Sequence, residues 1–346
     1  MARILVTGAT GFIGRALCSA LAHHGHEIIA GLRRAASPTP GAASVIVGDI
    51  APGWAWPSDF GQIDVVIHLA QQAHRTATEA LSGEPAAAVA LAKAAHRAGA
   101  ARLLYMSSVK AMGEETPTGR PFRAADPPQP ADMYGQGKLA TEQALVTATR
   151  ETSLELAIVR PPLVYGPGVR ANFRALMRLV ARGLPLPFAA IDNRRSLVFI
   201  DNLVDLTITA ALHPAAAGGV WLVRDDVDLS TPSLVRALAA GLGRPARMFA
   251  VPRAAWSLLQ AVPGLGSRLA PLTGSLQVDD ASTRATFDWL PPVPAMSGLA
   301  LTARSISFHW EWRLSSVLQD CRISSFVSTP CPTRKRRELA LSGQWC

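Results

Sequence analysis

The chain has 346 residues, a formal net charge of +9, 49% hydrophobic residues and 17% charged residues. This length and balance favour an ordered globular protein with a substantial core. No apolar run reaches about 18 residues, so no transmembrane helix is predicted. Basic residues are not interleaved with aromatic ones, so the positive charge does not indicate nucleic-acid binding.

The first predicted elements are a buried strand over residues 2–7, glycines at Gly8, Gly11 and Gly14, and an apolar helix from Arg15 to His24. Strand, glycine turn and helix form the phosphate half of a dinucleotide site. Glycine lets the backbone approach a pyrophosphate, and the helix N-terminus offers unpaired N–H groups. An ordinary strand–helix turn has the same spacing, but the position at the start of the chain favours a cofactor. The glycines interrupt the apolar run that a signal peptide requires.

A second strand, Glu27–Leu32, bears on which nicotinamide cofactor binds. An acidic residue at its end would bind the ribose 2′-hydroxyl of NAD. Arg33 follows instead, and an arginine suits the 2′-phosphate of NADP. NADP is therefore predicted ahead of NAD, with a solvated basic turn as the alternative. A third strand is predicted at Val45–Ile50, with Asp49 near its end as an adenine contact.

Two further buried strands are predicted at Val65–Ala70 and Leu103–Met106. His68, in the first of them, is interpreted as a hydrogen-bonded structural histidine rather than a ligand. The second strand ends at Ser107 and Ser108. Because ligands bind beyond the carboxyl ends of parallel strands, both strand ends are expected to face the cofactor.

A helix is predicted from Tyr134 to Ala148, which places Tyr134 and Lys138 one turn apart on one face. Hydride transfer between an alcohol carbon and nicotinamide requires a group that takes or gives the hydroxyl proton. A phenol ordinarily ionises at about pH 10, and a nearby lysine and oxidised nicotinamide favour the phenolate. We predict that Tyr134 is the acid/base, that Lys138 assists it and binds the nicotinamide ribose, and that Ser108 holds the substrate oxygen.

With these motifs the chain resembles the extended short-chain dehydrogenase/reductases, the NAD(P)-dependent nucleotide-sugar epimerase/dehydratase family. The resemblance covers roughly residues 2–306 and includes the runs 158–168 and 193–205. It implies an α/β fold with a Rossmann-type doubly wound parallel sheet and a smaller C-terminal substrate domain. Strands alternating with helices to about residue 165 likewise predict a parallel sheet covered on both faces.

The resemblance also implies binding roles. Arg195 is expected to bind the nucleotide-sugar diphosphate, for which a guanidinium fork is suited, and Asn172 is expected near the nucleotide phosphates. Substrate contacts are thus Ser108, Asn172 and Arg195. The complete set of predicted cofactor contacts is Gly8, Gly11, Phe12, Ile13, Gly14, Arg33, Asp49, Ile50, Leu69, Ala70, Ser107, Tyr134, Lys138, Pro161 and Val164.

Within the family, Ser107–Lys110 and the run 194–198 are similar to a bacterial subgroup of UDP-glucose 4-epimerase-like proteins and UDP-N-acetylquinovosamine dehydrogenases. This implies NAD(P)H-dependent reduction of a UDP-4-keto-6-deoxy-N-acetylhexosamine in polysaccharide or O-antigen synthesis. A UDP-sugar 4-epimerase and a non-catalytic NAD(P)-binding module remain alternatives. Dehydration is disfavoured because Val109 and Lys110 follow Ser108, where dehydratases commonly carry Asp-Glu. Glu84 stands where the family usually has an asparagine, and it is expected to alter the sheet edge or the nicotinamide pocket.

The resemblance divides the chain. Residues 1–165, with 196–216 returning to them, are expected to form the NAD(P)-binding domain, and 166–195 with 217–306 the nucleotide-sugar domain. Family members often dimerise through the helix that begins at Tyr134, so a homodimer is expected.

Two segments stand apart from this pattern. The Pro- and Gly-rich segment 114–132 is a candidate lid, with a stiff connector as the alternative. Residues 307–346 change composition abruptly and are expected to be poorly ordered, with a partner- or membrane-binding extension as the alternative and a shifted reading frame as a hypothesis for their origin. Three of the four cysteines lie there, without zinc spacing. With only Cys18 in the body, a reduced, cytoplasmic protein is predicted.

Overall fold

The computed structural model describes residues 1–36, 39, 41–70, 77–117, 119–252, 255–256 and 266–306, and only the backbone of residues 77–82 and 266–269. The expectations for the tail 307–346, and for the residues 71–76 of the loop before Glu84, lie outside this description. Residues 1–306 form one compact unit.

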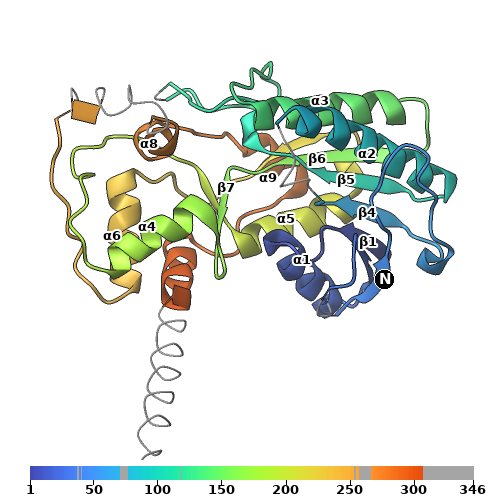
Figure 1. The fold of residues 1–346 in the computed structure, drawn as a ribbon, viewed down its shortest axis with the longest axis horizontal. Coiled ribbons are helices and arrows are strands. Elements are labelled where there is room, and N and C mark those ends of the chain that lie inside the picture. Colours follow the sequence, from blue (N-terminus) through green and yellow to red (C-terminus); the bar gives the residue numbers. More distant parts are fainter. Residues whose placement is uncertain are drawn as a thin grey trace, which may run out of the picture. The chain divides into compact units, whose positions relative to one another are not determined.

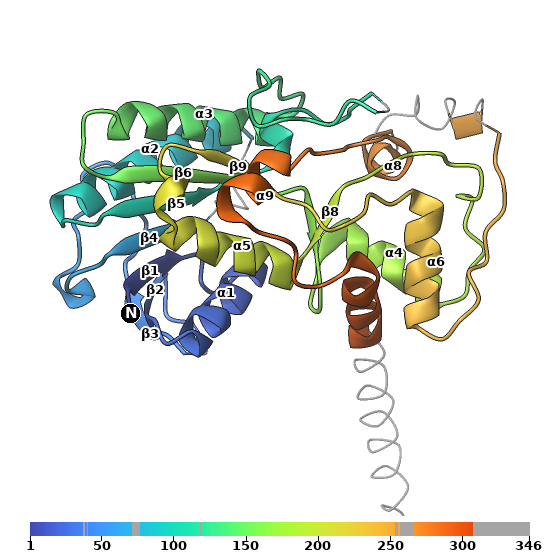
Figure 2. The ribbon, with the colours of Figure 1, turned by 180° about the vertical axis from the view of Figure 1, so that it is seen from behind.

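The centre of the molecule is a parallel sheet with the strand order β3-β2-β1-β4-β5-β6-β9 (Figures 1 and 2). The strands are β1 (Arg3–Thr7), β2 (Glu27–Leu32), β3 (Ala43–Ile46), β4 (Val65–His68), β5 (Arg102–Met106), β6 (Glu155–Arg160), β7 (Leu163–Tyr165), β8 (Leu197–Phe199) and β9 (Val220–Leu222). The chain proceeds outward from β1 in one direction and then in the other, which is the doubly wound order. The predicted Rossmann-type fold is therefore confirmed. A separate parallel pair, β7 with β8, lies outside this sheet.

Helices cover both faces of the sheet. The helices include α1 (Phe12–His23), α2 (Ala77–Arg97), α3 (Met133–Thr149), α4 (Ala171–Ala181), α5 (Ile200–Leu212), α6 (Thr231–Gly241), α8 (Gly266–Thr273) and α9 (Ala281–Phe287), with 3-10 turns η1 (Ser58–Phe60), η2 (Val109–Ala111) and η3 (Pro214–Ala216). Figure 1 shows α2 and α3 on one face, α1 and α5 on the other, and α4, α6 and α8 to one side of the sheet. Among the described residues, no helix has the length and apolar character needed to cross a membrane.

The alternation of side chains along β1 explains the two cores. Ile4 and Val6 pack into the core shared with α1 and α5, whereas Leu5 packs into the core shared with α2 and α3. A strand that is buried on both faces must be apolar at every position, because successive side chains point to opposite faces. This is why residues 2–7 are recognisable as an interior strand from sequence alone.

The strand ends differ from the prediction at two places. The third strand was predicted at 45–50 and is observed at Ala43–Ile46, because Gly48 adopts a left-handed φ of 67° that interrupts the extended chain. The fourth strand was predicted to reach Ala70 and ends at His68. The sequence analysis did not predict β9, a three-residue strand that adds to the edge of the sheet beside β6.

A buried carboxylate, Asp225, joins the second strand pair to α5. It accepts hydrogen bonds from the Tyr165 hydroxyl at 2.6 Å, the Phe199 amide at 2.9 Å and the Asn202 side chain at 2.7 Å. Burial raises the pKa of Asp225, an effect that these three donors oppose. The Asp225 carboxylate is thus the common hydrogen-bond acceptor that links β7, β8 and α5.

Replacing Asp225 with Ala should lower the free energy of unfolding by about 3 kcal/mol, because three buried hydrogen bonds are lost, although the Tyr165 hydroxyl and the Asn202 amide keep a second acceptor. Urea unfolding monitored by circular dichroism measures the change. Asp226→Ala, at the exposed neighbouring residue, which accepts one hydrogen bond from the Ala295 amide, is the matched control and should cost about 1 kcal/mol. Equal effects of the two substitutions would contradict this assignment.

Candidate active site

The parallel sheet brings the predicted residues to one edge. Gly8 follows β1, Leu69 follows β4, Ser107 follows β5 and Pro161 follows β6. These four segments lie next to one another because β1, β4, β5 and β6 are consecutive in the sheet. Backbone hydrogen bonds continue the ladder past the strand ends, from Leu69 N to Thr7 O at 3.1 Å and from Ser107 N to Val159 O at 2.8 Å.

The glycine loop packs too closely for side chains. A Cβ on Gly8, whose φ is +74°, would lie 2.7 Å from the Ala70 amide nitrogen, and a Cβ on Gly14 would lie 2.2 Å from the Gly8 carbonyl oxygen. Gly11 is the N-cap of α1 and provides no side-chain cap, so the first amides of the helix remain available. An uncapped helix N-terminus at the edge of a parallel sheet suits a phosphate group. These residues therefore fit the diphosphate of a dinucleotide.

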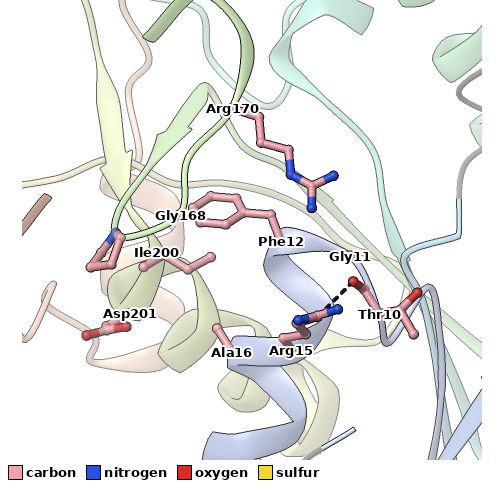
Figure 3. A pocket seen from close by; sticks show the side chains of 10 residues that line it. Thr10, Gly11, Phe12, Arg15, Ala16, Gly168, Arg170, Ile200 and Asp201 are labelled. Atoms are coloured by element: carbon pink, nitrogen blue, oxygen red, sulfur yellow. Dashed lines mark hydrogen bonds between the residues drawn. The ribbon is translucent and has the colours of Figure 1, made fainter. Parts of the chain in front are cut away.

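A cavity of about 380 Å³ adjoins this loop. Figure 3 shows Phe12 and Arg15 of α1 on one side of it and Arg170, from the segment before α4, on the other. The Arg15 guanidinium donates to the Thr10 carbonyl at 3.0 Å. Asp201 also lines the cavity, and burial raises the pKa of its carboxyl group. The sequence analysis included Phe12 but neither arginine, because no motif singles them out.

At the end of β2, the Arg33 guanidinium lies 3.8 Å from the Asp49 carboxylate, and both side chains are more than half exposed. The structure therefore brings together the two residues that were predicted to contact the adenosine end of the cofactor. An exposed pair of this length contributes little to stability. Both side chains consequently remain available to a ligand.

Tyr134 and Lys138 lie in the first turns of α3 but differ in environment. Tyr134 is 42% exposed, whereas Lys138 is 3% exposed. The Lys138 ammonium lies 5.9 Å from the centroid of the Tyr134 ring. An exposed phenol with a buried cation beside it is the arrangement that the predicted proton-transfer chemistry requires.

Close packing places the start of α3 against the turn that follows Ser108. A Cβ on Gly135 would lie 2.2 Å from the Lys110 carbonyl oxygen, so only glycine allows this approach. The Lys110 ammonium donates to the carboxylate of Asp132, the N-cap of α3, and to that of Glu114, each at 2.7 Å. Ser108 caps η2 by accepting from the Lys110 amide at 3.2 Å. Sequence reasoning missed Gly135, although its position directly after the tyrosine is a usable signal.

Glu84 does not sit apart from the site: it contacts Lys138 directly. The Glu84 Oε1 atom lies 2.8 Å from Lys138 Nζ and accepts from the Tyr105 hydroxyl at 2.9 Å. It is carried by α2, in which Pro85 directly follows it. Glu84 was expected to alter the sheet edge or the nicotinamide pocket, and what it adds there, compared with an asparagine, is a carboxylate beside Lys138.

A second buried ion pair supports the turn after β5. Ser107 donates to Glu142, one turn beyond Lys138 on α3, and Glu142 pairs with Arg160 at the end of β6. The Arg160 Nε–Glu142 Oε1 distance is 2.9 Å. The Ser107 hydroxyl is therefore held in place by its hydrogen bond to the Glu142 carboxylate. The sequence analysis assigned no role to Glu142 or Arg160, whose contacts join segments that are distant in sequence.

The two residues predicted to bind the nucleotide phosphates lie in different surroundings. Asn172 is exposed on the first turn of α4. Arg195 is half-buried, bridges Leu229 and Leu276 through its backbone, and donates from its guanidinium to the Gly274 carbonyl at 3.0 Å. Burial lowers the pKa of Arg195, and the nearby charges of Glu115 and Glu114 oppose this shift.

The predicted lid segment 114–132 is tied to the residues 275–279. Thr116 N donates to Ser275 O at 2.8 Å and Phe122 N donates to Gln277 O at 2.9 Å. Asp279 N in turn donates to Phe122 O at 2.8 Å. These contacts match the alternative of a stiff connector more closely than that of a free lid.

His68 is a structural residue, as interpreted from the sequence. Its Nδ1 atom lies 2.7 Å from Thr7 Oγ1, and its ring stacks on Tyr105. Burial, and then the charge of Lys138, lower the pKa of His68 to about 4, against a smaller opposing effect of Glu84. Within the described residues, no cluster of His, Cys, Asp or Glu could hold a metal ion.

Comparison with known proteins identifies the family. The model of the NAD dependent epimerase/dehydratase family matches residues 4–223. The chain belongs to this family. The resemblance inferred from the motifs is confirmed, and the protein is an enzyme of the NAD-dependent epimerase/dehydratase type.

Relatives within the family extend over nearly the whole chain. A UDP-glucose 4-epimerase of Vibrio cholerae is 40% identical over 312 residues, which are 87% of this chain and 94% of that protein. A dTDP-6-deoxy-L-talose 4-dehydrogenase (NAD(P)(+)) of Kitasatospora kifunensis is 31% identical over 84% of this chain and 91% of that protein. The crystal structure of UDP-glucuronic acid 4-epimerase from Bacillus cereus in complex with NAD superposes with a TM-score of 0.71 at 20% identity, covering 89% of this chain and 99% of that chain. This last likeness concerns the fold.

The free energy of unfolding should fall as the pH drops from about 6.5 to about 4, because His68 is protonated in the unfolded chain over this range but stays neutral in the folded protein. The stabilisation is fully present above pH 6.5 and decreases by about 1.4 kcal/mol per pH unit, or about 3 kcal/mol in all. Urea unfolding at several pH values should show that His68→Asn flattens this dependence. His24→Asn, at an exposed histidine, should leave it unchanged. Parallel curves for the wild type and H68N would contradict the assignment.

Proposed function

We propose that this enzyme reduces the C4 ketone of a UDP-4-keto-6-deoxy-N-acetylhexosamine with NADH or NADPH, in the synthesis of a surface polysaccharide or O-antigen. The observation that carries the proposal is the placement of exposed Tyr134 beside buried Lys138, packed against the turn of Ser108 at the carboxyl edge of the sheet. An acid/base, a cation and a hydroxyl at one edge are the protein groups that ketone reduction requires.

Each residue has a distinct task in this proposal. Tyr134 donates its hydroxyl proton to the ketone oxygen, and Ser108 orients that oxygen by a hydrogen bond, since a hydroxyl that accepts one bond retains its own hydrogen. Lys138 is assigned to the nicotinamide ribose, which requires that a ribose hydroxyl replace one of the three protein acceptors of its ammonium group. The bound nicotinamide supplies the hydride that the protein itself lacks.

The phosphates are assigned to two other groups of residues. The amides of Phe12 and Ile13, at the uncapped start of α1, bind the cofactor diphosphate. Arg195 and Asn172 are assigned to the substrate diphosphate. For Arg195 this requires that the substrate replace part of its interaction with Gly274 and the neighbouring carboxylates.

The names of two relatives support chemistry at the same carbon. One is a UDP-glucose 4-epimerase and the other a dTDP-6-deoxy-L-talose 4-dehydrogenase (NAD(P)(+)), and both names specify position 4 of a nucleotide-linked sugar. We transfer that position, but not the sugar, to this chain.

A UDP-sugar 4-epimerase is the second candidate, and the 40% identity to the Vibrio cholerae protein favours it. The two candidates differ in the fate of the cofactor. A reductase consumes one reduced cofactor per turnover, whereas an epimerase regenerates its cofactor within the site.

Absorbance at the reduced-nicotinamide band distinguishes the two candidates. With the UDP-4-keto-6-deoxy-N-acetylhexosamine, continuous and stoichiometric loss of the band is expected. A flat band together with conversion of UDP-glucose to its C4 epimer would establish the epimerase instead. Cofactor binding without either reaction would leave a non-catalytic binding module.

The assembly and location are also proposals. We propose a cytoplasmic homodimer in which α2 and α3 of two copies form a four-helix interface. Val146 on α3 is 45% exposed, which is consistent with an apolar contact at this face. Sedimentation at several protein concentrations tests the dimer, and a monomer at micromolar concentration would exclude it.

Replacing Tyr134 with Phe should lower kcat about 100- to 10,000-fold, because the proton donor is removed while the ring remains. Binding of NADH, followed by its fluorescence, should change less than twofold and serves as the control for folding. Retention of wild-type kcat by Y134F would show that another group transfers the proton.

Replacing Arg33 with Ala should weaken NADPH binding about tenfold and NADH binding less than twofold, because only NADPH carries the 2′-phosphate. Fluorescence titration with each cofactor measures both effects. Arg34→Ala, at the exposed neighbouring arginine, is the control and should affect both cofactors equally. If R33A also weakens both cofactors equally, Arg33 does not distinguish them.

A further inference from the structure

All three donors of the Lys138 ammonium are directed at protein acceptors. They point to the Glu84 carboxylate at 2.8 Å, the Tyr105 hydroxyl at 3.1 Å and the Met106 carbonyl at 3.3 Å. An ammonium group has three N–H bonds, so these contacts account for its full donor capacity. Among the described residues, Glu84 is the one charged partner of Lys138, and both members of the pair are buried, with the Glu84 side chain 9% and the Lys138 side chain 4% exposed.

We propose that Glu84 is a positioning residue that offsets the charge of Lys138, keeps Tyr134 protonated to higher pH, and thereby favours proton donation to a ketone over proton removal from an alcohol. The charge effect on Tyr134 follows from the geometry alone. The preference for one reaction direction rests on the function proposed above.

The charge effect has a simple physical basis. A lone ammonium 5.9 Å from the Tyr134 ring would favour the phenolate, because a buried ammonium is screened less than a solvated one. A carboxylate 2.8 Å from the ammonium converts the single positive charge into an ion pair. The potential of such a pair falls off more steeply with distance than that of an isolated charge. Tyr134 is therefore exposed to a weaker positive potential.

Other charged groups around the site are paired among themselves. Glu142 pairs with Arg160, and Asp132 pairs with Lys110. His68 is buried behind Tyr105 and is neutral at neutral pH. The described titratable groups on the elements and turns next to Lys138 and Tyr134 include Glu84 of α2, Tyr105 of β5, His68 of β4, Asp132 and Glu142 next to and on α3, Lys110 of η2 with its partner Glu114, and Arg160 of β6.

The consequence for the reaction follows from which form of Tyr134 acts. In ketone reduction, the carbonyl carbon gains a hydride from the reduced nicotinamide, the oxygen gains the Tyr134 proton, and tyrosinate remains. In alcohol oxidation, tyrosinate must be present first. An epimerase needs both forms, whereas a reductase begins each turnover with the phenol. A carboxylate that opposes tyrosinate formation therefore suits the reductive direction.

The chain offers a direct readout, because it contains three tyrosines: Tyr105, Tyr134 and Tyr165. Burial, followed by the charges of Glu84 and of Asp225 respectively, raises the pKa of Tyr105 and of Tyr165 far above the ordinary range. Tyrosinate absorbance in a pH titration of the folded protein thus reports Tyr134. Loss of the signal in Tyr134→Phe verifies the assignment.

The test compares this titration in the wild type and in Glu84→Gln, which retains an acceptor for Lys138 and Tyr105 but removes the charge. We expect the midpoint to move down by about one pH unit. Glu155→Gln is the matched control: it removes the carboxylate from the Arg102–Glu155 pair, 2.5 Å apart at the amino ends of β5 and β6, and should not move the midpoint. Coincident midpoints for the wild type and a folded E84Q would overturn the proposal, as would equal shifts for E84Q and E155Q.

Circular dichroism across the pH range verifies folding. If E84Q does not fold, Glu84→Asn, a shorter neutral amide, provides the same comparison. The titration uses no substrate, so it is independent of the proposed activity. A shifted midpoint in a protein that reduces no keto sugar would reject the proposed function and retain the charge effect. An unshifted midpoint in an active reductase would reject the charge effect and retain the proposed function.

Discussion

Lys138 determines much of what surrounds it, because an ammonium group can be buried only if its charge and donors are satisfied. Its acceptors are the Glu84 carboxylate of α2 and two groups of β5, the Tyr105 hydroxyl and the Met106 carbonyl. The helices α2 and α3 must therefore pack against the same end of the sheet for the lysine to be accommodated. Breaking such a pair leaves a buried charge without its partner, which ordinarily costs several kcal/mol. The same interaction sets the charge that the exposed Tyr134 experiences, so one ion pair connects the packing of the domain with the chemistry at its edge.

The sheet was predictable because burial on both faces leaves a simple pattern. β1, β2 and β5 are short apolar runs, and Gly8 and Gly14 after β1 are required because a Cβ at either position would clash with the backbone. The placement of Ser108, Tyr134 and Lys138 near one edge of the sheet could likewise be predicted, since Ser108 follows β5 and the other two begin the next helix, α3. The short β9 and the ends of β3 and β4 could not, because three or four residues carry too little periodicity and a single glycine changes where a strand stops.

The partners of these residues were less accessible to sequence reasoning. Glu84 was recognisable as an unusual residue, but its contact with Lys138 spans 54 positions of the chain and depends on how two helices pack. Gly135 and Arg170 likewise act through segments that are distant in sequence. Local patterns identify the candidate catalytic residues, whereas the charged groups that lie beside them become visible only once the chain is folded.

The measurement that tests the account most directly follows deuterium from NADH labelled at the transferred position. The enzyme is incubated with the UDP-4-keto-6-deoxy-N-acetylhexosamine, and the product is examined by mass spectrometry and NMR. The account predicts one deuterium at C4 of each product sugar, with one NADH oxidised per sugar. Conversion of a UDP-sugar to its C4 epimer without net NADH oxidation, and with no label acquired from the added NADH, would contradict it.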